Sequence, residues 1–277
     1  MKTFKSLIFT AFILISQLQY AQIKVGGKAG FSLGNLSENS SNLYSKDFES
    51  ITGYDFGVFT EFSVSDQFAV RLEVLSTRKG GRRDGIQPIP LEGILSSGQD
   101  INFLNQLAIL SGGTTITDQT PLFANYSNKS ELTYLEIPLL GRYSWGNQER
   151  FYVEAGPYIG ILIKAEQITI GNSTFYADEA GNLPLIIPNP LGGTPFSFPE
   201  QTFSERTDVI DNLERTNYGV QFGLGFFRDY DNKHEISFGV RATYGFVPIQ
   251  KNETFGNNKI GSITFNFSYA RIFGKSN

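Results

Sequence analysis

Apolar and polar residues alternate most clearly between positions 132 and 162, LTYLEIPLLGRYSWGNQERFYVEAGPYIGIL. Leu135 and Ile137 fall on one parity of this stretch, and Glu136 and Arg142 fall on the other. A period of two is typical of β-strands, whose successive side chains point to opposite faces. The stretch therefore predicts two strands joined by a short polar turn.

The same alternation recurs along the chain and predicts eight strands. They are expected at 22–36, 54–64, 68–78, 132–145, 151–162, 217–227, 235–247 and 260–273. Each has eleven to fifteen residues. A tilted strand needs about 9–11 residues to cross a bilayer, whereas soluble strands average about 5–6. Short and long connections alternate, which is typical of outer-membrane barrels with short periplasmic turns and longer outer loops.

The two faces of these strands differ in chemistry, and two architectures fit them: a soluble lipocalin-like barrel with an apolar lumen, or a membrane barrel with a polar lumen. One parity carries glycine and charge, and the other carries Phe, Tyr, Val, Ile and Leu. Eight strands leave too narrow a lumen for so many bulky side chains, whereas opposite charges can pair inside it. We therefore expect an all-β fold: an eight-stranded antiparallel transmembrane up-and-down β-barrel with a polar lumen, short periplasmic turns and two long extracellular loops.

This assignment predicts where individual side chains lie. A structural network of lumen charges is expected from Lys28, Glu61, Arg71, Glu73, Glu136, Arg142, Glu154 and Arg241. The side chains expected to face lipid include Leu135, Ile137, Leu139, Val153, Ile159, Phe222, Phe238 and Phe265. Aromatic residues near strand ends should form interfacial girdles, namely Tyr54, Tyr143, Tyr218, Phe246 and Phe273.

Two long insertions, at about 79–130 and 165–214, interrupt the strands. In the first, Asp100 is placed to cap a helix over 101–110, with Ile101, Leu104, Leu107 and Ala108 on one side. In the second, the proline-rich run 183–200 does not fit a central strand. Positions 204–215 predict a helical turn or two, with Val209, Ile210 and Leu213 facing inward.

The first residues read as a targeting segment. Lys2 and Lys5 precede an apolar run at 7–15, and Gln19-Tyr20-Ala21 follows with the small residue Ala21 at the expected cleavage site. This pattern predicts a signal peptide at 1–21 and a mature barrel domain at 22–277. We therefore expect an exported protein located in the outer membrane.

Composition narrows the chemistry further. The chain has no cysteine, which excludes thiol nucleophiles and cysteine metal sites, and its net charge of −4 argues against a nucleic-acid partner. Its single histidine, His234, lies in a charged turn, where a serine–histidine mechanism would still need a serine and an acid beside it. No catalytic residue, metal site or cofactor is therefore expected.

Three further groups have alternative interpretations. Glu136 and Glu154 resemble a catalytic carboxylate pair, but lumen carboxylates of this kind are more often structural. Asp100 and Asp118 carry oxygen ligands for calcium but lack EF-hand spacing. The basic run at 80–83 fits either a phosphate or lipopolysaccharide headgroup site or, more simply, a solvated loop.

Three motifs carry a family resemblance: KVGGKAGFSLGNL at 24–36, YLEIPLL at 134–140 and YVEAGPY at 152–158. Together they resemble the PorT-type outer-membrane β-barrel proteins. The resemblance covers the barrel but not the two long insertions, and it implies a barrel of the same broad shape as the OmpA transmembrane domain. One branch of this family assists a protein-secretion system, and nothing in the sequence singles out that branch.

The expected function follows from these features. We expect a non-enzymatic barrel with a structural, binding or docking role through its long outer loops. Its expected partners are the outer-membrane bilayer and an extracellular ligand or envelope protein. The alternatives are a porin-like channel for small solutes, an accessory barrel of a secretion system and a lipid-modifying enzyme.

Overall fold

The computed structural model describes residues 22–37, 42–91, 94, 98, 100–231 and 233–274, so the expected signal peptide lies outside the described part. Eight long strands dominate it. They are β1 (Ile23–Leu36), β2 (Glu49–Ser63), β3 (Phe68–Ile89), β4 (Leu122–Gly146), β5 (Glu149–Ser173), β9 (Thr216–Tyr230), β10 (His234–Pro248) and β11 (Lys259–Phe273).

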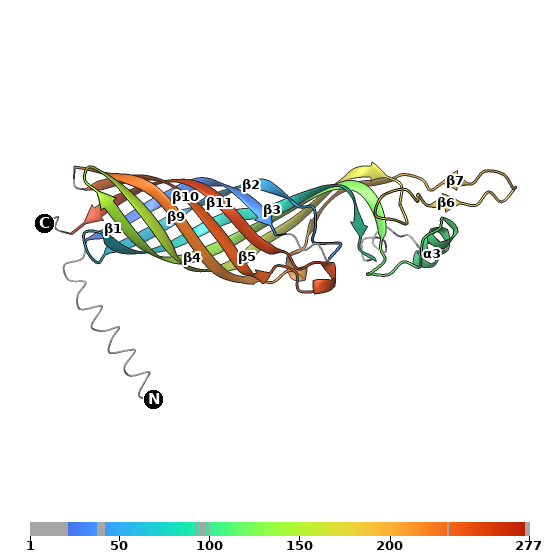
Figure 1. Cartoon of the computed structure of the whole chain (residues 1–277), viewed down its shortest axis with the longest axis horizontal. Coiled ribbons are helices and arrows are strands. Elements are labelled where there is room, and N and C mark those ends of the chain that lie inside the picture. The colour runs from blue at the N-terminus through green and yellow to red at the C-terminus, as the bar shows by residue number, and fades with distance from the viewer. Residues whose placement is uncertain are drawn as a thin grey trace, which may run out of the picture.

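The eight strands close into a barrel. Each pairs antiparallel with its sequence neighbours in the ring, and β1 closes the circle by pairing with β11 through Ile23 and Phe273. The short connections from β2 to β3, from β4 to β5 and from β9 to β10 lie at this same end, and α3, β6 and β7 lie beyond the opposite end (Figure 1). The expected eight-stranded up-and-down topology is confirmed.

The barrel wall has an apolar outside and a polar inside, which confirms the expected lumen. Exposed outer side chains include Leu139, Ile159, Phe222, Phe238 and Phe265, while Leu135, Ile137 and Val153 are partly exposed. Such a continuous apolar belt suits hydrocarbon and not water. The barrel therefore crosses a membrane through its strands.

Over the part of the chain that the structure describes, no helix combines the length and the apolar character needed to span a bilayer.

Three strands continue far beyond the barrel (Figure 1). The ladder between β3 and β4 runs without interruption from Lys79–Leu132 to Ile89–Leu122. The outer half of β5 pairs with β8 (Gln201–Asp208), which completes a four-stranded sheet. We call this sheet, together with the connections 90–121 and 174–200, the outer lobe.

The lobe corrects two expectations. The insertions at 79–130 and 165–214 begin with continued barrel strands, and polar residues such as Arg83 and Gln87 extend the β3–β4 ladder. Positions 204–208 are strand and not helix, since the free edge of β5 supplies backbone hydrogen-bond partners. Only η2 (Ile210–Asn212) is helical there.

The predicted helix is present as α3 (Ile101–Leu110), and the side chain of Asp100 accepts a hydrogen bond from the Asn102 amide at its start. Two short strands, β6 (Ile186–Ile187) and β7 (Phe196–Ser197), pair beside it in the proline-rich segment. The expectation that this segment holds no central strand is confirmed.

Candidate functional site: the closed lumen and the outer lobe

The periplasmic half of the lumen is filled by ion pairs around Glu61. Its carboxylate lies 2.7 Å from Arg71 Nη2, 3.1 Å from Arg142 Nη1 and 3.5 Å from Lys24 Nζ. Lys24 also pairs with Glu235. Five charged groups therefore share this small space.

Aromatic rings hold these cations in place. The guanidinium of Arg142 lies 3.9 Å from the ring centre of Tyr152. Tyr152 in turn packs over Gly225 and Gly239, where an added β-carbon would collide with it. Glycine at these two lumen positions therefore makes room for the ring.

Arg241 forms the middle layer of the network. It reaches the Glu73 carboxylate at 2.5 Å, pairs with Glu154, and lies 3.2 Å from the Gln221 amide oxygen. Lys28 lies 3.4 Å from Glu73 on the other side. These carboxylates are held by cations and are nearly inaccessible, which argues against the acid–base chemistry that an exposed carboxylate pair supports.

Lys79 forms the upper layer with Glu136, at 2.5 Å. Gln221 also donates to Glu136, at 3.1 Å. Sequence reasoning missed Lys79 because the predicted strand ended at Arg78. Its position could have revealed it, because Lys79 lies an even number of positions after Arg71 and Glu73 and so faces the same side of the strand.

The eight residues expected in the lumen network are all buried with ionic partners, and four more charged residues are buried beside them. The buried cations of the described barrel are Lys24, Lys28, Arg71, Lys79, Arg142 and Arg241, and the buried carboxylates are Asp55, Glu61, Glu73, Glu136, Glu154 and Glu235. Their formal charges cancel. Balance of this kind is needed because an unpaired buried charge is costly.

An apolar plug closes the outer end of the lumen. It contains Leu36, Leu132, Tyr134, Leu162, Ala165, Leu213, Ile249 and Ile260, with Phe48, Val209 and Ile210 packed against them. The expected inward placement of Val209, Ile210 and Leu213 is thus confirmed. The lumen is therefore closed at two levels, by ion pairs nearer the periplasmic end and by apolar side chains at the outer end.

Segment 42–48 lies at the outer end of the barrel and ties the outer connections together. Its contacts are Leu43 O with Arg83 Nη1 (2.8 Å), the Tyr44 hydroxyl with Asp118 O (3.3 Å), Lys46 with Glu179, and Ser45 O with Asn258 Nδ2 (3.0 Å). Burial raises the pKa of Tyr44 to about 12, so its hydroxyl stays a neutral donor. Burial lowers the pKa of Arg83, and Asp47 opposes that shift.

The outer lobe has its own hydrophobic core. One face of the sheet packs on α3 and the two connections through Ile89, Ile94, Leu104, Leu107, Ala108, Ile116, Leu122, Ala124, Tyr126, Phe175, Leu185 and Phe198. A core of this size fixes the lobe as a folded body, in contrast to a pair of loose loops.

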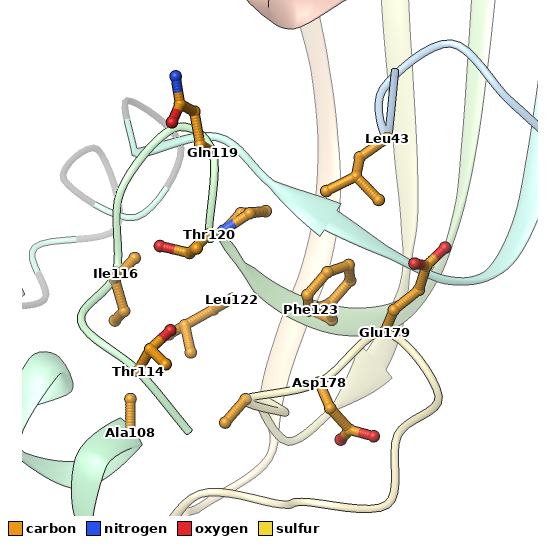
Figure 2. A pocket seen from close by; sticks show the side chains of 12 residues that line it. Leu43, Ala108, Thr114, Ile116, Gln119, Thr120, Leu122, Phe123, Asp178 and Glu179 are labelled. Atoms are coloured by element: carbon orange, nitrogen blue, oxygen red, sulfur yellow. The ribbon is translucent and has the colours of Figure 1, made fainter. Parts of the chain in front are cut away.

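A cavity of about 220 Å³ opens at the edge of this core (Figure 2). Figure 2 shows the Phe123 ring on one side and Ile116, Thr120 and Thr114 opposite. The carboxylates of Asp178 and Glu179 lie on the rim. The cavity therefore combines apolar walls with an acidic edge.

The remaining candidates are not brought together into a site. His234 begins β10 and does not lie in the expected turn, and its Nδ1 lies 2.6 Å from the Tyr269 hydroxyl. Asp118 receives a bond from Tyr44 through its backbone, and among the described residues no cluster of three metal-ligating side chains occurs. Of the basic run 80–83, Arg83 is buried and Arg82 pairs with Asp84.

Comparison with known proteins supports the same architecture. A family model described as an outer membrane protein beta-barrel domain matches residues 16–251. No curated protein matches the chain.

Among solved structures, the chain is similar to Ail of Yersinia pestis in complex with sucrose octasulfate, with 10% identity, coverage of 91% of this chain and 99% of that one, and a TM-score of 0.34. It is also similar to neisserial surface protein A, with 11% identity, coverage of 91% of this chain and 97% of that one, and a TM-score of 0.38. A third similar structure is a major outer membrane protein from Thermus thermophilus, with 12% identity, coverage of 91% of this chain and 99% of that one, and a TM-score of 0.38.

Proposed function

Because the chain belongs to the family of outer membrane protein beta-barrel domains, we propose that it is a non-enzymatic protein that binds a ligand at the cell surface through its outer lobe. The protein resides in the outer membrane, in contact with lipid. We further propose that residues 1–21 are a signal peptide, that 22–277 form the barrel domain, and that the balanced lumen charges are structural.

The observation that carries this proposal is the division of the chain between a closed barrel and a folded lobe. The lumen is filled by paired charges and an apolar plug, so solute passage is not supported. The lobe has a separate core and a cavity at the edge of that core. A binding role uses this arrangement, whereas a porin-like channel does not. The role of accessory barrel in a secretion system stays a prediction from the sequence resemblance.

The volume and the lining of the cavity restrict the size and the chemistry of the ligand. Its volume of about 220 Å³ is smaller than the roughly 300–1,000 Å³ of pockets for drug-sized molecules. Phe123 and Ile116 suit an apolar or ring face. The rim carboxylate of Asp178 accepts from the Asn182 and Leu183 amides and that of Glu179 pairs with Lys46, and each carboxylate has further lone pairs that can accept from hydroxyl or amino groups. A single sugar residue, free or at the end of a longer glycan, meets both requirements.

A matched pair of variants tests this proposal. Thr114 lines the cavity and is exposed, whereas the neighbouring Thr115 is exposed but does not line it. The full chain in detergent would be titrated with glucosamine, N-acetylglucosamine, glucose and glucuronic acid, and bound species counted by native mass spectrometry. We expect binding by the wild type and Thr115→Trp, and its loss in Thr114→Trp.

Two outcomes would contradict the proposal. Unchanged binding by Thr114→Trp would place the site elsewhere, and failure of the wild type to retain any of the four sugars would remove the assigned ligand class. Heat-modifiable migration on a gel checks that each variant retains a folded barrel.

A further inference from the structure

An apolar groove of about 560 Å³ crosses the lipid-facing wall of the barrel, away from the outer lobe. It spans four adjacent strands, β9, β10, β11 and β1. Its lining residues are Ala29, Gly30, Phe31, Leu224, Gly225, Phe226, Phe238, Gly239, Val240, Phe265, Asn266 and Phe267. None of them is charged.

The two walls of the groove are rows of side chains that pair across the strands. One row runs through Phe31, Phe265, Val240 and Leu224, and the other through Ala29, Phe267, Phe238 and Phe226. The row between them consists of the inward-facing partners Gly30, Asn266, Gly239 and Gly225. The floor of the groove is therefore backbone.

Ring contacts explain why the groove stays open. Along the first wall Phe31 stacks on Phe265, with ring centres 5.2 Å apart. Along the second, Phe238 contacts Phe226 at 5.6 Å and Phe267 at 5.0 Å. Each ring thus leans on its neighbour within a row, and the space between the rows is left free.

Elsewhere on the belt, rings contact each other along a strand. Tyr54 and Phe56 lie with ring centres 5.2 Å apart, and Tyr244 and Phe246 with ring centres 5.9 Å apart. Such contacts join successive rows and fill the space that would separate them. The groove is therefore a product of a particular ring arrangement and not of the barrel shape alone.

The dimensions of the groove select its occupant. The centres of two rows that are two residues apart lie about 6.6–6.8 Å apart, so that only a thin occupant fits between their side chains, and three strand intervals give a length of about 14 Å. A helix, at about 10–12 Å in diameter, is too wide to enter. The groove lies within the surface that faces the hydrocarbon of the outer membrane, where acyl chains are the available apolar molecules of this width.

We propose that this groove is a binding site, here called the seat, for one acyl chain of an outer-membrane lipid. The chain lies between the two phenylalanine rows and against the glycine backbone. The protein thus carries a specific lipid position in addition to the general contact of its belt.

Photocrosslinking with matched variants tests the seat. The full chain would be placed in nanodiscs that contain a phospholipid with a diazirine in its acyl tail, irradiated, and mapped by peptide mass spectrometry. We expect adducts on the groove residues at several times the yield on belt residues of β2. Val240→Trp adds bulk to one wall and should reduce groove adducts several-fold.

Val58→Trp is the matched control, because Val58 is exposed on β2 and does not line the groove. It should leave groove adducts at the wild-type yield. If Val240→Trp fails to assemble, Leu224→Phe narrows the same wall and replaces it.

Two results would overturn the proposal. Uniform labelling around the belt would mean ordinary lipid contact without a seat. Crosslinks between two protein chains at the groove, with a dimer mass, would assign it to a second copy of the chain.

Discussion

At the scale of single residues, Arg241 shows how strongly the lumen depends on pairing. It lies between Glu73 and Glu154, and all three are almost inaccessible. Arg241→Met should lower the free energy of unfolding by about 3–5 kcal/mol, because two buried carboxylates lose their shared cation. Urea unfolding in lipid vesicles, followed by tryptophan fluorescence, measures this loss.

The control is Arg228, which pairs with Glu149 at 3.7 Å but is half exposed. Arg228→Met should change the free energy of unfolding by no more than about 1 kcal/mol, because water already screens this pair. Equal effects of the two substitutions would refute the structural role assigned to the buried charges.

A second residue prediction concerns the lipid-facing side. Leu139 lies halfway along the barrel part of β4 and is 49% exposed. Leu139→Arg should cost about 2–4 kcal/mol, because it places a charge near the bilayer midplane. Reduced heat-modifiable migration and a lower urea midpoint would report this cost.

The matched substitution is Leu110→Arg on α3, where the leucine is 58% exposed in the outer lobe. Water can solvate that charge, so the expected change is within about 0.5 kcal/mol. Normal assembly of Leu139→Arg together with a defect in Leu110→Arg would reverse the assignment of the lipid-facing surface.

Parity made the side of each strand residue predictable, since a period of two fixes which face a side chain occupies. The ionic partners of these residues were not predictable in the same way. Arg241 and Glu73 are 168 residues apart, and their contact depends on how the whole barrel closes. The sequence therefore predicts that the charges lie inside, and only the closed ring determines which of them meet.

At the scale of elements, the outer halves of β3, β4 and β5 were the main features missed. The run from Gly80 to Gly85 is glycine-rich and polar, as in a loop, and Gly80 does have a positive φ of 153°. Its strand state depends on long-range pairing with β4. Helix α3 was predictable because its cap and its apolar face are local in sequence.

The separate core of the lobe leads to an element-level prediction. Leu104 is fully buried in that core. Leu104→Ala should destabilise the lobe by about 2–5 kcal/mol through lost packing. Hydrogen exchange should accelerate in α3 and in the outer half of β4, whereas β11 amides keep their wild-type protection.

Phe103→Ala on the exposed side of α3 is the control, with little expected change in exchange. If Leu104→Ala accelerated exchange in β11 as much as in α3, the lobe and the barrel would unfold as one unit. Independent unfolding of the lobe is what its separate core predicts.

At the scale of the whole molecule, the two closures of the lumen act in series. Paired charges fill the lumen from its periplasmic end up to Lys79 and Glu136, and the apolar plug fills the outer end. Ions meet a filled, charge-balanced space in one and a desolvation barrier in the other. Either closure alone is then sufficient to block conduction.

Planar-bilayer recording provides the test of this arrangement. The wild type should show no steady conductance above background. Tyr134→Ala, which weakens the plug, should also stay at background, because the ion pairs below it remain intact. Arg142→Ala should behave in the same way, because the plug above it remains. Stable channel steps from the wild type would contradict the closed lumen. Steps from only one variant would identify the closure that blocks ions, and with it the part of the barrel on which solute exclusion depends.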